Sequence, residues 1–109
     1  MYIYELEFKV RDYECDLQGV VNNSVYQNYL KHTRHEFLLE NQLSFDQLHQ
    51  QGIDAFVARV EIAYKQPLRS ADAFISRLYV KKDGVKYVFH QAIFRKNDEK
   101  LCIKARIDT

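Results

Sequence analysis

The spacing of apolar residues changes twice along this chain of 109 residues, and these changes constrain its fold more than any other feature. Apolar and polar side chains alternate over residues 2–10, which is typical of a strand with one solvent-facing side. Over residues 24–40 apolar side chains recur at helical spacing, as on the buried face of a helix. Alternation then returns in four segments, 56–65, 73–82, 85–95 and 101–108. The order predicts a strand, a long helix and four further strands.

Capping signals set the expected ends of the helix. Ser24 and Gln27 have the Ser-x-x-Gln spacing of a capping box, so we expect the helix to begin there. Asn41 is expected to close it in a left-handed conformation. A second capping-box pattern predicts a short helix over residues 44–52.

Two turns are predicted from their residue types. Asp16 and Gly19 occupy the first and fourth positions of a turn between the first strand and the helix. Asp83 and Gly84 form a dipeptide suited to a two-residue hairpin between the segments 73–82 and 85–95, because both tolerate positive φ.

Together these elements predict one α+β domain over residues 1–109, with an antiparallel sheet packed on one helix. One sheet over one helix leaves a sheet face and an edge uncovered, so we expect self-association.

The net charge and the hydropathy pattern argue against several classes of protein. The formal net charge of +1 argues against a nucleic-acid binder that relies on counterion release, and the strands lack the pattern of an RNA-binding sheet. No apolar run approaches the roughly 20 residues needed to cross a bilayer, and the first residues lack the features of a signal peptide. We therefore expect a cytoplasmic protein. The two parts of the chain differ in charge. The part up to Ala58 has 4 basic and 9 acidic residues, whereas the part after it has 12 basic and 6 acidic residues.

Asp16 is the strongest candidate for chemistry, because it lies between a strand and the expected start of a helix. Backbone N–H groups at a helix N-terminus can polarise a carbonyl, and a nearby carboxylate can then hydrolyse an ester or thioester as general base or as nucleophile. From the residues alone, a turn-forming aspartate is the more frequent interpretation. Cys15 is a weaker nucleophile candidate, and His32 and His35 lack the further ligands that a metal site needs.

The stretch RDYECDLQGVVNNSVY at residues 11–26, continuing through Tyr29 to Arg34, closely resembles the hotdog-fold acyl-CoA thioesterases of the 4-hydroxybenzoyl-CoA thioesterase type. The resemblance implies a five-stranded antiparallel sheet wrapped around one long central helix. It further implies homodimers or homotetramers with active sites between subunits. Asp16 would be catalytic, the N–H of Asn23 would polarise the thioester carbonyl, and Gly19 would permit the tight loop.

The resemblance also implies the substrate. The expected function is hydrolysis of an acyl-CoA or related thioester without a metal or cofactor, and the alternative is a module that binds acyl-CoA or an acyl carrier protein without turnover. Asn23 stands where some relatives have His, Lys31 stands where Glu is frequent, and relatives commonly continue beyond Thr109. Further candidates for contact with substrate or with the phosphates of coenzyme A are Tyr26, Lys81, Lys82, Lys86 and Arg95. For the four basic residues the alternative is a solvated sheet rim.

Overall fold

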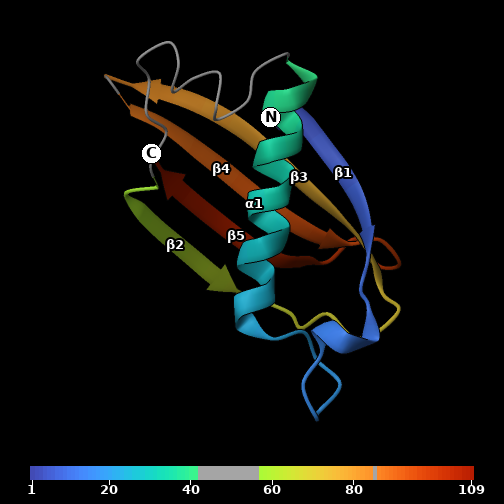
Figure 1. Cartoon of the computed structure of the whole chain (residues 1–109). Helices are drawn as coiled ribbons and strands as arrows, with labels where there is room; N and C mark the ends of the chain where they lie inside the picture. Colours follow the sequence, from blue (N-terminus) through green and yellow to red (C-terminus); the bar gives the residue numbers. More distant parts are fainter. Residues whose placement is uncertain (42–56, 85) are drawn as a thin grey trace.

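The computed structural model describes residues 1–41, 57–84 and 86–109, in which five antiparallel strands curve around one helix (Figure 1). The strand order is β1-β3-β4-β5-β2. The elements are β1 (Tyr4–Lys9), the 3-10 turn η1 (Asp12–Glu14), α1 (Asn23–Glu40), β2 (Arg59–Tyr64), β3 (Ala73–Asp83), β4 (Lys86–Arg95) and β5 (Leu101–Asp108). The predicted order of the strands and the long helix along the chain is therefore confirmed. The short helix expected over residues 44–52 lies outside the described residues.

The first strand has the predicted alternation. The side chains at even positions of β1 are partly buried toward α1, and those at odd positions are exposed. Two of the exposed carboxylates pair across the sheet, Glu5 with Arg77 at 3.3 Å and Glu7 with Lys96 at 2.9 Å. Charges on the outward side of an edge strand disfavour pairing with another sheet.

The helix begins and ends differently from the prediction. It starts at Asn23, one residue before Ser24, so the Ser24 capping box is wrong. The N-cap is Asn22, whose N–H donates to the carbonyl oxygen of Glu14 at 3.1 Å, and this contact with an earlier segment sets the start. Asn41 has φ −91° and is not left-handed. Its backbone N–H and its side-chain amide both donate to the carbonyl oxygen of Phe37, at 3.2 and 2.8 Å, so this carbonyl of the last turn has two donors.

The β3–β4 hairpin turns one residue later than predicted. Asp83 pairs with Lys86 in the ladder, so Asp83 belongs to the strand and not to the turn. Gly84 takes φ +63° at the first turn position, where glycine is favoured. Asp83 keeps an extended conformation and remains in β3.

The core lies between α1 and the concave face of the sheet. Phe74 of β3 is fully buried and stacks on Phe8 at 5.0 Å between ring centroids, with Tyr29 of α1 at 4.7 Å. Two buried polar contacts fix how the helix sits on the sheet. Thr33 and Ser76 share a hydrogen bond of 2.7 Å, and the Gln91 amide donates to the carbonyl oxygen of Leu30 at 3.0 Å.

The helix does not cover the whole sheet. It packs mainly on β3 and β1, whereas β2 forms the opposite edge (Figure 1). Val60 and Tyr64 share a face of β2 with Ile62, which packs against the core, yet they remain 41% and 46% exposed. An apolar strip along this edge therefore stays open in the single chain. No described helix combines the length and apolar character needed to span a membrane.

Candidate active site

A short closed loop carries Asp16 between β1 and α1. The loop is closed by a bridge between Cys15 and Val21, and the Asp16 N–H donates to the carbonyl oxygen of Val20 at 2.9 Å. Gly19 donates its N–H to the carbonyl oxygen of Asp16 at 3.0 Å and takes φ +78°. The predicted Asp16–Gly19 turn is thus confirmed, and glycine is favoured there by its positive φ.

Only one of the two carboxylate oxygens of Asp16 takes part in the hydrogen bonds of this turn. Its Oδ1 accepts the N–H of Gln18 at 2.8 Å and that of Val20 at 3.4 Å. Its side chain is exposed, and within the described parts of the chain Oδ2 has no hydrogen-bond donor. One oxygen therefore shapes the loop, as expected of a turn aspartate, while the other is available to water or a substrate carbon.

α1 begins at Asn23, seven residues after Asp16. The N–H groups of Asn23 and Ser24 find no acceptor among residues 1–41, 57–84 and 86–109, and no acidic residue occupies the first turn. The N–H groups and the positive end of the helix dipole are thus available to a carbonyl oxygen that gains negative charge.

A cavity of about 220 Å³ lies beside this helix end. Asn23 and Tyr26 line it from α1, and Tyr64, Lys65 and Gln66 line it from the end of β2 and beyond. Tyr26 is buried, and its hydroxyl oxygen accepts the Leu68 N–H at 2.9 Å. Tyr64, Lys65 and Gln66 were not among the site residues predicted from the sequence. Their one sequence signal was their position at the end of a strand just before Pro67.

The basic candidates do not form one group within the chain. Lys81, Lys82 and Lys86 are exposed near the β3–β4 turn, at the opposite end of the molecule from the loop that precedes α1 (Figure 1). Arg95 lies at the other end of β4 and is largely covered. It donates to Asp98 Oδ2 at 2.8 Å and to the carbonyl oxygen of Pro67 at 2.7 Å. Arg95 therefore holds the segment that lines the small cavity.

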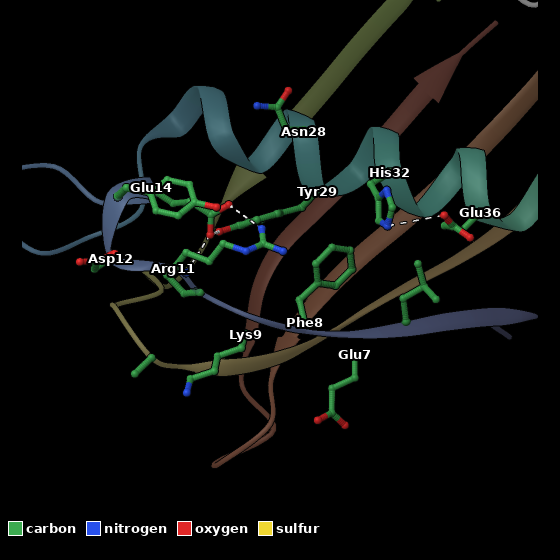
Figure 2. Close-up of a pocket in the computed structure, with 14 residues that line it drawn as sticks. Glu7, Phe8, Lys9, Arg11, Asp12, Glu14, Asn28, Tyr29, His32 and Glu36 are labelled. Carbon is green, nitrogen blue, oxygen red and sulfur yellow. Dashed lines mark hydrogen bonds and ion pairs between the residues drawn. The ribbon is translucent and has the colours of Figure 1, made fainter.

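A larger groove of about 1050 Å³ separates β1 and η1 from α1 (Figure 2). Glu14 is buried at its end, and Tyr29 reaches from α1 toward the Glu14 carboxylate. His32 pairs with Glu36 at 3.8 Å. In the described segments no group of three or more His, Cys, Asp or Glu side chains is arranged to hold a metal ion. This groove does not include Asp16.

Cys15 is a poor nucleophile in this setting. Partial burial raises the pKa of its thiol, and the neighbouring carboxylates of Asp16 and Glu14 raise it further. A higher pKa leaves less of the reactive thiolate at neutral pH. Among the side chains of the loop, the carboxylate of Asp16 is better suited to chemistry.

Comparison with known proteins identifies the family of this chain. Residues 10–109 match the family model of the thioesterase-like superfamily. The chloroplastic acyl-acyl carrier protein thioesterase ATL3 of Arabidopsis thaliana is 35% identical over 104 residues, which cover 94% of this chain but 55% of ATL3. The chain thus spans about half the length of this curated relative.

Solved structures share the fold. The YbaW probable thioesterase from Escherichia coli superposes with a TM-score of 0.85 at 26% identity, over 95% of this chain and 78% of YbaW. A 1,4-dihydroxy-2-naphthoyl-CoA thioesterase from Synechocystis gives a TM-score of 0.88 at 16% identity, over 96% and 78% of the two chains. The predicted hotdog fold is confirmed, and the chain belongs to the thioesterase-like superfamily.

Proposed function

We propose that this protein hydrolyses an acyl thioester, with coenzyme A or an acyl carrier protein as the thiol part. The observation that carries the proposal is the Asp16 carboxylate, which lies on a closed loop that leads into the first amides of α1. Among the described residues, one oxygen of this carboxylate has no donor and the Asn23 and Ser24 amides have no acceptor. The family match and the names of the relatives support a thioester as substrate. CoA and acyl carrier protein both appear among those names, so the proposal includes both.

Two mechanisms fit this arrangement. As a general base, Asp16 removes a proton from water while the water oxygen bonds to the carbonyl carbon, and the Asn23 N–H stabilises the oxyanion. Collapse of the intermediate breaks the C–S bond, and the proton passes to the thiolate. As a nucleophile, Asp16 bonds to the carbonyl carbon and expels the thiolate, and water then hydrolyses the resulting anhydride. Both routes yield a free acid and a thiol.

We further propose that two copies pair through β2. No strand in the described ranges pairs with the outer edge of β2, and the inward face of β2 is apolar and exposed at Val60 and Tyr64. Tyr64 also lines the small cavity beside Asn23, so a second copy on this edge would enclose the site. A site between subunits is also what the resemblance implies. The exposed Lys81, Lys82 and Lys86 stay candidates for contact with the phosphates of CoA.

The test is a panel of acyl-CoA and acyl-acyl carrier protein thioesters that differ in chain length and aromatic character. Release of free thiol is followed over time, and binding of each compound is measured in parallel. The proposal predicts turnover of at least one thioester. Saturable binding without thiol release across the panel would favour the alternative, a non-catalytic acyl-binding module.

A further inference from the structure

Glu14 is a buried carboxylate two residues before Asp16, and no step of the proposed reaction uses it. It lies at the end of η1 and is 9% exposed. Its Oε1 accepts the backbone N–H of Arg11 at 2.8 Å and the phenolic O–H of Tyr29 at 2.8 Å (Figure 2). Its Oε2 accepts Nη1 of Arg11 at 3.3 Å. The carboxylate thus joins the turn that precedes the Asp16 loop to the second turn of α1.

The backbone of Glu14 makes a second connection to the same helix. Its carbonyl oxygen accepts the N–H of Asn22, the N-cap of α1, at 3.1 Å. Cys15 then bridges Val21, and Asp16 follows. Glu14 therefore contacts α1 through its backbone at the N-cap and through its side chain at Tyr29. Two separated contacts restrict rotation as well as translation of the loop base relative to the helix.

We propose that Glu14 and Tyr29 are positioning residues that hold the Asp16 carboxylate in register with the first amides of α1. This inference rests on the proposed function, because the register matters only if both groups act on one carbonyl. Displacement of a reacting group by about 1 Å can lower a rate about 100-fold, so the rigidity of this loop base has a direct effect on turnover.

The hydrogen bond from the Tyr29 hydroxyl to the Glu14 carboxylate is expected to persist at neutral pH. Burial raises the pKa of Tyr29 above its usual range, and the hydrogen bond and charge of Glu14 raise it further. The phenol therefore stays protonated at neutral pH and continues to donate to the carboxylate. Tyr29 also packs its ring on Phe8 and Phe74, so replacement by Phe removes the hydroxyl while the ring can keep these contacts.

The experiment compares Tyr29→Phe with a matched control, Thr33→Val. Thr33 is buried one turn further along α1, and its hydroxyl bonds to Ser76 and to the Tyr29 carbonyl oxygen without touching the Asp16 loop. Both variants lose one buried hydroxyl. Two readouts are taken on the full chain, kcat and KM with the best thioester of the panel, and hydrogen exchange of the Gln18 and Asn22 amides, which report on the loop and its base.

We expect Tyr29→Phe to lower kcat about 10- to 100-fold with little change in KM, and to speed exchange of both amides, whereas Thr33→Val changes neither. Glu14→Gln, which keeps the shape of the side chain, should act in the same direction as Tyr29→Phe. Unchanged exchange and kcat in Tyr29→Phe, or equal losses in Thr33→Val, would overturn the inference. If the wild type hydrolyses no thioester, the proposed function fails, while the exchange data alone still decide whether the pair holds the loop.

Discussion

Arg34 of α1 donates a hydrogen bond from Nη1 to the side-chain oxygen of Gln91 in β4 at 2.9 Å, and both side chains are buried. No carboxylate pairs with this guanidinium among the residues with described positions. Burial lowers the pKa of Arg34 to about 10, which still leaves it charged at neutral pH. Gln91 is thus the neutral group that solvates a buried charge.

Gln91→Leu is expected to destabilise the protein by about 1–3 kcal/mol, because it removes the acceptor and leaves a buried donor unsatisfied. Urea unfolding followed by circular dichroism measures this change. The double variant Arg34→Met with Gln91→Leu should recover part of the loss, since no buried charge remains. A double variant less stable than Gln91→Leu alone would show that Arg34 stabilises the fold by other means.

Phe74→Ala is expected to cost about 3–5 kcal/mol in the free energy of unfolding. Its side chain is fully buried between Phe8 and Tyr29, so truncation leaves a cavity in the centre of the core. Leu39→Ala on the exposed side of α1 serves as the control and should change stability by less than about 0.5 kcal/mol. Similar losses in the two variants would contradict the described core.

Val60→Lys is expected to weaken self-association, because it places a charge on the exposed apolar face of β2. Light scattering should give the wild type about twice the chain mass of 13.0 kDa, or about four times that mass if dimers pair, and a smaller mass for the variant at low concentration. Ile3→Lys, an exposed apolar position beside the opposite edge strand, is the control and should leave the mass unchanged. A monomeric wild type would refute pairing through β2.

His90 is expected to make stability depend on pH. Partial burial lowers its pKa below the usual 6.5, Lys81, Arg106 and Lys104 lower it further, and Asp108 opposes them. The unfolded chain then binds more protons than the folded chain as pH falls below 6.5, so stability present above this pH is progressively lost. His90→Gln should flatten the fall in unfolding free energy between about pH 7 and pH 5.5. An unchanged slope would show that other groups dominate, such as His35, whose pKa is also lowered.

The order of strands and helix could be predicted from sequence because each element has one buried face with its own period. The Asp16–Gly19 turn was predictable for a similar reason, since its two residues interact within one short stretch of chain. Features that depend on distant contacts could not be predicted. The helix starts at Asn23 because the N–H of Asn22 donates a hydrogen bond to the carbonyl oxygen of Glu14. The guanidinium of Arg95 donates a hydrogen bond to the carbonyl oxygen of Pro67, which is 28 residues away in the sequence.

In the candidate site, too, residues on one short stretch could be predicted, and residues brought in from distant parts of the chain could not. Asp16, Gly19 and Asn23 lie on one short stretch that the family resemblance identifies, and the structure places them on one closed loop and the helix that follows it. The lining from Tyr64 to Gln66 comes from a distant part of the chain, where no local pattern signals a site. The contact between Glu14 and Tyr29 joins two residues 15 positions apart and became visible only in three dimensions.

The most direct measurement of the central claim is the thiol-release rate of Asp16→Asn beside wild type and Asp12→Asn. The amide oxygen that Asp16→Asn introduces can still accept from the N–H groups of Gln18 and Val20, so the loop should persist while the base or nucleophile is lost. Asp12 is an exposed carboxylate on η1 and controls for the loss of one charge nearby. We predict that Asp16→Asn loses about 100-fold or more in kcat while Asp12→Asn stays near wild type. Equal rates for all three proteins would contradict the proposed role of Asp16.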